Sequence, residues 1–308
     1  MKNSNHFFNF FIEMMADIPE NHLSNFEDLL NILLSMFSDR IKDNNVKFEN
    51  ERLYYLNLLS QKILVHGFSI KSLTNGITLE SSINNFSTNM FEPFSIYSIE
   101  RTLIENYLVQ NYLSNSSENE DTLDCRFAIW MRYGINKRNI LPESDEEKRV
   151  VELDNKAIEN FENQIKSKEC YKNLSQKKKE SFFKTINKEW KILFFEDKFK
   201  PISWSELINE AGIKDGINDK IYNFLSWHAH SQSISILQFK EMWDTNSEQE
   251  AIIQSIKKVN MFIAFLIADI ILSNNDFENT YYSLSEEHKN MVNYYNFSFR
   301  SDLYLIKS

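Results

Sequence analysis

The chemistry open to this chain depends on a few polar side chains placed within apolar segments. Arg101 and Glu105 are four residues apart, so on a helix they share one face and can form an ion pair. Their neighbours include Leu103, Ile104 and Leu108, which indicates that part of this helix is buried. Two interpretations follow: an ordinary ion pair on a helix surface, or a half-buried pair that organises a polar pocket.

A second group of polar residues is Tyr222, Ser226 and His230. Successive steps of four place these side chains in one stripe along a helix. His230 is then either a core histidine satisfied by hydrogen bonds, or a functional histidine that acts as an acid and base or contacts an anion. His228 would lie about 200° from His230 around such a helix, so the two cannot chelate one metal ion together. We therefore expect no metal site.

Asp269 interrupts the strongest apolar run of the chain, Met261–Leu272. A carboxylate on an apolar helix must be paired, protonated or placed at the wet edge of the helix. We expect a buried pairing with Arg101 or His230, because all three are polar groups within apolar helical segments. The candidate catalytic residues are therefore Arg101, Glu105, Tyr222, Ser226, His230 and Asp269.

The charge of the chain is distributed unevenly. Residues 166–200 hold eleven Lys against five acids, a local charge of +6. The net charge of the chain is −10, so the remaining residues together carry −16. One interpretation is a solvated helix face decorated with lysines. The other is a phosphate-binding surface, in which Lys177, Lys178 and Lys179 would hold a nucleic-acid backbone. The acidic chain as a whole does not favour binding to nucleic acid or to an anionic membrane.

Several standard functional motifs are absent from the sequence. It has no glycine-rich phosphate loop, no His-Glu-x-x-His, no Cys-x-x-Cys, no Gly-x-Ser-x-Gly and no EF-hand loop. We expect no cofactor, although these absences do not exclude every enzyme. The two cysteines, Cys125 and Cys170, form no metal-binding pattern, and we interpret them as reduced thiols, with one disulfide conceivable in principle.

The apolar segments predict a chain that neither crosses nor binds a membrane. Met261–Leu272 is shorter than the roughly 20 apolar residues that span a bilayer, so we interpret it as a buried core helix. The apolar patch from Phe7 to Met15 lacks the uninterrupted run and the cleavage site of a signal peptide. These features favour a cytoplasmic location.

Composition and helix-start signals predict an all-α fold. Five Gly and four Pro in 308 residues favour long helices with few sharp turns. Three Ser/Thr-x-x-Glu capping boxes begin at Ser24, Ser203 and Thr245. We expect helices at about 24–42, 50–66, 94–113, 122–138, 143–167, 175–195, 203–211, 217–231, 246–273 and 283–297. They would form one composite domain over residues 1–308, a multi-helix bundle with long antiparallel helices and a peripheral lysine-rich helical hairpin at 143–200.

The polar motifs resemble those of a family of helical proteins. Arg101 and Glu105, followed about 120 residues later by Tyr222, Leu225, Ser226 and His230, resemble the bacterial domain of unknown function numbered 5677. The likeness covers about residues 50–270 and includes the segment 204–212. Ser231 stands where that family would have Pro. The resemblance implies a helical fold, and more loosely a likeness to the HEPN superfamily, which includes dimeric defence and toxin ribonucleases. No Arg in this chain has a His at the HEPN spacing, so no HEPN catalytic residue is carried over.

Two functions are consistent with these features, and whether the chain is an enzyme is left open. The first is a binding or scaffold component, with a protein partner or a second copy of the chain, within a bacterial defence or stress module. The alternative is a metal-independent ribonuclease or toxin that acts on RNA. In that case His230 would be the acid and base, and Arg101 would stabilise the phosphate charge.

Overall fold

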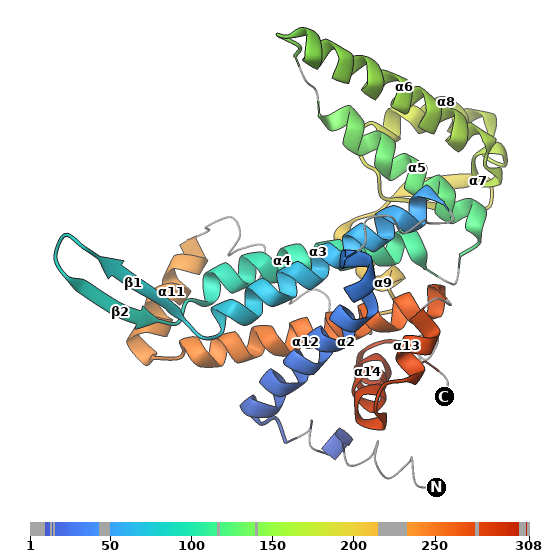
Figure 1. Ribbon diagram of the computed structural model, residues 1–308. Coiled ribbons are helices and arrows are strands. Elements are labelled where there is room, and N and C mark those ends of the chain that lie inside the picture. The colour runs from blue at the N-terminus through green and yellow to red at the C-terminus, as the bar shows by residue number, and fades with distance from the viewer. Residues whose placement is uncertain are drawn as a thin grey trace, which may run out of the picture. The chain divides into compact units, whose positions relative to one another are not determined.

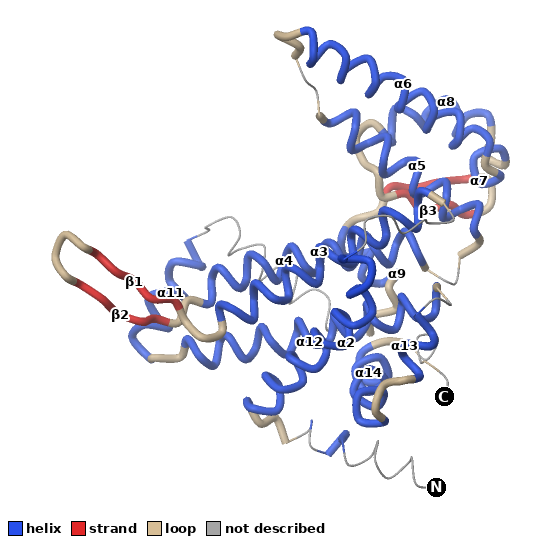
Figure 2. The backbone as a smooth tube through the Cα atoms, in the orientation of Figure 1, coloured by secondary structure: helices blue, strands red, loops and turns tan. Residues whose placement is uncertain are grey.

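The computed structural model describes residues 10–12, 14, 16–42, 50–115, 118–138, 141–214, 233–274, 277–301 and 306. Helices dominate this part of the chain, and its strands pair into two antiparallel two-stranded sheets (Figure 2). The predicted all-α, multi-helix fold is therefore confirmed. The predicted helix at 217–231 lies outside the described residues.

The chain divides into two compact units. Unit 1 combines both ends of the chain, Met1–Asn111 and Ile208–Ser308, and unit 2 is the continuous segment Tyr112–Leu207. The segment 143–200, expected as a charged helical hairpin within a single composite domain, lies inside unit 2. Two helices, α4 (Pro93–Ser114) and α9 (Trp204–Glu210), cross the two boundaries.

The remaining elements follow in chain order (Figure 1). Those of unit 1 are α2 (Pro19–Lys42), α3 (Glu51–Leu73), β1 (Ile77–Ser81), β2 (Phe86–Met90), α11 (Ser233–Thr245), α12 (Glu248–Ser273), α13 (Glu278–Tyr282) and α14 (Glu286–Phe299). Those of unit 2 are α5 (Glu120–Lys137), α6 (Asp145–Ser167), α7 (Glu169–Lys172), α8 (Gln176–Ile186), β3 (Ile192–Phe195) and β4 (Lys198–Pro201).

The core of unit 1 is built around α12. Residues 259–271 of this helix are buried almost without interruption, which confirms that the strongest apolar run of the sequence is a core helix. Helix α12 packs against α2 and α14. Leu29, Leu30 and Leu33 of α2 are buried in the core. Gly67 allows α3 to approach α2 closely, because a Cβ at Gly67 would collide with Leu30.

One of the three predicted capping boxes is confirmed. At the start of α9, Ser203 Oγ accepts a hydrogen bond from the Glu206 N–H at 3.2 Å, and Glu206 accepts from the Ser203 N–H at 2.7 Å. The Ser203 N–H, followed by the Lys200 ammonium, lowers the pKa of Glu206 to about 2. A further capping box begins α6 at Ser144, where none was expected.

The other two boxes were wrong because the helices begin elsewhere. Helix α2 starts at Pro19, so Ser24 lies inside it. Proline suits a first helical turn, where its missing N–H leaves no bond unmade. Thr245 is the last residue of α11, and the chain turns at Asn246 with a φ of 52° before α12 begins.

The predicted helix at 175–195 ends early, at Ile186. Residues 192–195, Ile-Leu-Phe-Phe, form β3 instead and pair with β4, with Phe194 opposite Phe199. Branched and aromatic side chains favour a strand, and Glu196 takes the positive φ of the tight turn. Helix α3 extends beyond the predicted end at 66, to Leu73, and residues 77–90 form the β1–β2 hairpin, which was not predicted.

We predict that Tyr112→Phe lowers the free energy of unfolding by about 1–3 kcal/mol. The Tyr112 hydroxyl donates to the Ile192 carbonyl at 2.8 Å and accepts from the Ile192 N–H at 2.9 Å, so the change leaves two buried backbone groups of β3 unpaired. Urea denaturation measures the loss. Tyr133→Phe is the matched control within the same unit, because Lys137 contacts the ring of Tyr133, which this change keeps. Equal stability of the two variants would contradict the prediction.

Candidate functional site

The predicted ion pair between Arg101 and Glu105 is present on α4. Arg101 Nε lies 3.0 Å from Glu105 Oε1, and the two side chains are 17% and 28% exposed. The pair is therefore half-buried. The pockets described below are lined by other residues, so this pair does not organise them.

Asp269 is buried and paired, as expected, but with a different partner. Its carboxylate accepts hydrogen bonds from Arg300 at 2.7 Å, Asn111 at 2.8 Å and the Tyr107 hydroxyl at 3.0 Å. Arg300 is fully buried and also donates to the Ala211 carbonyl at 2.9 Å. The expected pairing with Arg101 was wrong, because Arg101 binds Glu105. Asp269 is thus saturated by donors from α4 and the end of α14, which is the environment of a structural carboxylate.

Tyr222, Ser226 and His230 lie outside the described residues. The pairing of His230 with Asp269, expected from the sequence, stays a prediction.

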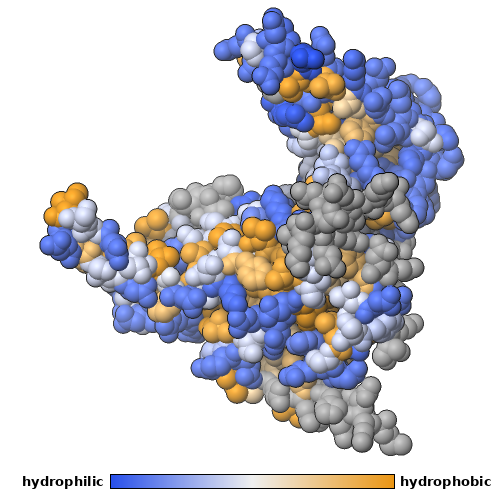
Figure 3. Space-filling view, in the orientation of Figure 1, coloured by the Kyte–Doolittle hydropathy of each residue, from blue (hydrophilic) through white to orange (hydrophobic). Residues whose placement is uncertain are grey.

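The three lysines at the start of α8 differ in their surroundings. Lys178 lies over the Phe199 ring at 5.4 Å, and Lys179 donates to the Lys172 carbonyl at 2.6 Å. Lys177 is exposed. Unit 2 as a whole holds 18 Lys and Arg against 18 Asp and Glu, so its net charge is zero. Its surface is largely hydrophilic around α6 and α8 (Figure 3). These features match a solvated face, and phosphate binding by the lysines stays a prediction.

The described residues contain neither a metal-binding cluster nor a membrane-spanning helix. No three His, Cys, Asp or Glu side chains gather there as a metal ion would require. None of the helices that the structure describes combines the length and the apolar character needed to cross a bilayer.

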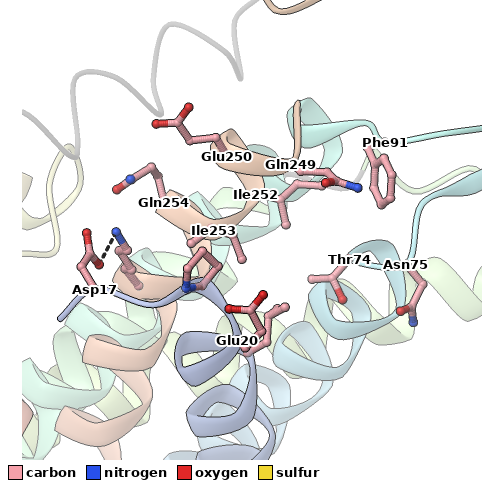
Figure 4. Close-up of a pocket in the computed structure, with 13 residues that line it drawn as sticks. Asp17, Glu20, Thr74, Asn75, Phe91, Gln249, Glu250, Ile252, Ile253 and Gln254 are labelled. Carbon is pink, nitrogen blue, oxygen red and sulfur yellow. Dashed lines mark ion pairs between the residues drawn. The ribbon is translucent and has the colours of Figure 1, made fainter. Parts of the chain in front are cut away.

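A pocket of about 740 Å³ lies within unit 1 (Figure 4). Four stretches of chain far apart in sequence supply its walls: the start of α2, the end of α3, the link after β2, and the first three turns of α12. Its lining residues are Asp17, Pro19, Glu20, Leu23, Thr74, Asn75, Phe91, Gln249, Glu250, Ile252, Ile253, Gln254 and Lys257. None of them belonged to the predicted site.

The one lysine in this lining is already neutralised. Lys257 Nζ lies 2.6 Å from Asp17 Oδ1, and His22 Nε2 lies 2.7 Å from the same oxygen. The Lys257 ammonium and then His22 lower the pKa of Asp17, so this carboxylate stays ionised. Figure 4 labels Asp17 at one edge of the pocket and marks its ion pair with a dashed line.

Two carboxylates of the pocket are available to a ligand. Glu20 in the first turn of α2 and Glu250 in the first turn of α12 form no ion pair with any residue that the structure describes. The pocket also includes Thr74 and Asn75, which follow the carboxyl end of α3. That end carries a partial negative charge from the helix dipole, while the amino ends of α2 and α12 at the same pocket carry partial positive charge. The full negative charges of Glu20 and Glu250 outweigh these partial charges and favour a cation.

Beside this pocket lies a smaller one of about 280 Å³, which shares Asp17 and Lys257 with it. Lys258 lines the smaller pocket and lies 2.8 Å from Glu100, a fully buried carboxylate of α4. Burial raises the pKa of Glu100, an effect that the nearby Lys258 offsets in part. Sequence reasoning selected Arg101 and overlooked its neighbour Glu100.

We predict that Glu100→Gln changes the pH dependence of stability. The pKa of Glu100 is raised above its ordinary value of 4.5 in the folded chain, so its ionisation costs stability as the pH rises above 4.5. Gln cannot ionise. The free energy of unfolding of Glu100→Gln should therefore rise relative to the wild type as the pH increases above 4.5. Urea titrations at several pH values measure this difference, and a difference that is constant with pH would refute the prediction.

Comparison with known proteins does not add a relative. No family model, no curated protein and no solved structure matches this chain.

Proposed function

We propose that this chain is a ligand-binding helical protein whose pocket in unit 1 takes a small organic cation. The proposal rests on the pocket of about 740 Å³ and its two carboxylates, Glu20 and Glu250, which have no ion-pair partner among the described residues. Small-molecule sites in proteins typically measure roughly 300–1,000 Å³.

The charge of unit 1 supports a positive ligand. The chain carries −10, and unit 2 is neutral, so unit 1 carries the whole −10. A field of one sign raises the local concentration of ligands of the opposite sign and speeds their association. Within the pocket, Glu20 and Glu250 outnumber the single cation Lys257, which Asp17 already neutralises.

The walls of the pocket indicate that the ligand also has an apolar part. Ile252, Leu23 and Phe91 offer apolar surface, and the Phe91 ring can bind a cation on its face. The amides of Asn75 and Gln249 supply donors and acceptors that can orient polar groups. A primary amine on a short aromatic or aliphatic skeleton combines the chemistry of both walls.

We predict that tyramine binds this pocket and that Glu250→Gln weakens its binding by roughly fivefold, because the change removes one exposed charge interaction worth about 1 kcal/mol. Isothermal titration calorimetry at low ionic strength measures both affinities. Glu248→Gln is the matched control: Glu248 lies in the same helical turn but does not line the pocket.

Hydroxyphenylpropionate tests the sign of the ligand, since it has the same ring with a carboxylate in place of the amine. Binding of the carboxylate in preference to the amine would overturn the proposed ligand charge. No heat of binding with any amine of a panel that includes agmatine and spermidine would overturn the proposed function.

The two functions expected from the sequence are broader or different. A role in a bacterial defence or stress module, the resemblance to the family numbered 5677 and RNA cleavage with His230 as acid and base stay predictions. His230 lies outside the described residues, so no geometry bears on that reaction.

A further inference from the structure

The two cysteines of the chain are brought together within unit 2. Cys125 lies on α5, and Cys170 lies on α7, far along the sequence. The N–H of Cys170 donates to Asp121 Oδ2 at 3.2 Å, and Asp121 stands one helical turn before Cys125, on the same face of α5. This bond holds the backbone of Cys170 next to the turn that carries Cys125.

A second bond fixes the same junction. Lys168 Nζ lies 2.7 Å from Asp124 Oδ2, so Asp124 and Asp121, which flank one turn of α5, both bind the chain around Cys170. The neighbouring Cys170 thiol, together with burial, raises the pKa of Cys125. Cys125 is fully buried, whereas Cys170 is partly exposed, and both are free thiols.

We propose that Cys125 and Cys170 form a reversible disulfide when the protein meets a low-molecular-weight disulfide. The chain contains only these two cysteines, and they lie on two packed helices, α5 and α7, which the bonds of Asp121 and Asp124 hold together. A buried cysteine alone would act as a small apolar side chain. A buried thiol beside a partly exposed one has the arrangement of a resolving and an attacking thiol.

The reaction proceeds by two thiol–disulfide exchanges. The Cys170 thiol gives its proton to water, and its thiolate attacks the small disulfide, which forms a mixed disulfide and releases one small thiol. Cys125 then loses its proton to water, attacks the sulfur of Cys170 and releases the second small thiol. One small disulfide is reduced to two thiols, and two protein thiols are oxidised to one disulfide.

The product would link α5 to α7 and close a loop that contains α6. A cross-link that closes a long loop restricts the unfolded chain and stabilises the fold. We expect the oxidised protein to melt roughly 5–10 °C above the reduced protein.

The test is incubation of the full chain with oxidised glutathione, followed by intact-mass measurement and thiol counting. The expected product has lost two hydrogen atoms, has no free thiol, melts at the higher temperature and returns to the reduced form with dithiothreitol. Cys125→Ser should stop at one persistent glutathione adduct on Cys170, and Cys170→Ser should stay unmodified because its remaining thiol is buried.

Both variants are compared in the reduced state by circular dichroism, so that a folding defect is recognised. A wild-type chain that keeps both thiols, carries two glutathione adducts or cross-links to a second chain overturns the proposal. So does a rapid adduct on Cys125 in the folded Cys170→Ser variant, because that would contradict the assigned order of attack.

Discussion

Replacing Arg300 by Met is expected to lower the free energy of unfolding by about 3–5 kcal/mol. Arg300 has no solvent exposure, and its guanidinium binds Asp269 at 2.7 Å and the Ala211 carbonyl at 2.9 Å. Its removal leaves a buried carboxylate with only the neutral donors Tyr107 and Asn111. Loss of one partner of a buried pair costs far more than the pair contributes, because the remaining charge stays desolvated.

Chemical denaturation of the full chain, followed by fluorescence, measures this loss. Lys71→Met is the control within unit 1, because Lys71 and Glu27 form an ion pair with side chains 37% and 55% exposed. Its effect should stay within about 0.5 kcal/mol. A double variant, Asp269→Leu with Arg300→Met, should recover part of the loss, since no unpaired charge remains. An Arg300→Met protein as stable as the control would show that the network contributes nothing.

Phe182→Ala is expected to cost about 3–5 kcal/mol in unit 2. Phe182 on α8 is fully buried, and its ring meets those of Phe199 at 4.9 Å and Tyr171 at 5.3 Å between centroids. These contacts join α8 to β4 and α7. The truncation removes the buried contacts of the ring and leaves a cavity, and both effects destabilise the fold.

Phe195→Ala provides a matched control on the neighbouring strand β3. Phe195 is 43% exposed, so its truncation removes little buried apolar surface. The change should lower the free energy of unfolding by less than about 1 kcal/mol. Thermal unfolding followed by circular dichroism compares the two variants. If Phe182→Ala melts at the same temperature as Phe195→Ala, the ring cluster is not the core of this unit.

The helical fold was predictable because its signals are local. The run at 261–272 became the second half of α12, and Ser203 with Glu206 capped α9 as predicted. The errors arose where a local signal had a competitor. The capping box at Ser24 was wrong because α2 starts earlier, at Pro19. The helix predicted through 195 was wrong because residues 192–195 form β3, a strand that needs its partner β4.

The candidate site was less predictable because its contacts join distant segments. The pattern around Asp269 predicted a buried pairing, but nothing local identified Arg300 as its partner. Glu100 did carry a signal: it stands on the buried stripe of α4 with Ile96 and Tyr107, at spacings of four and seven. Glu20 and Glu250, which define the pocket, have no distinguishing pattern, because exposed acids in first helical turns are common.

The discontinuity of unit 1 has a consequence for the order of events during synthesis. Helix α2 precedes unit 2 in the sequence, but two of the helices that cover its apolar stripe, α12 and α14, follow unit 2. Every residue of unit 2 is available by Leu207, well before α12 is complete. Unit 2 can therefore fold first, while the part of the α2 surface that α12 and α14 cover stays exposed until these two helices have been translated.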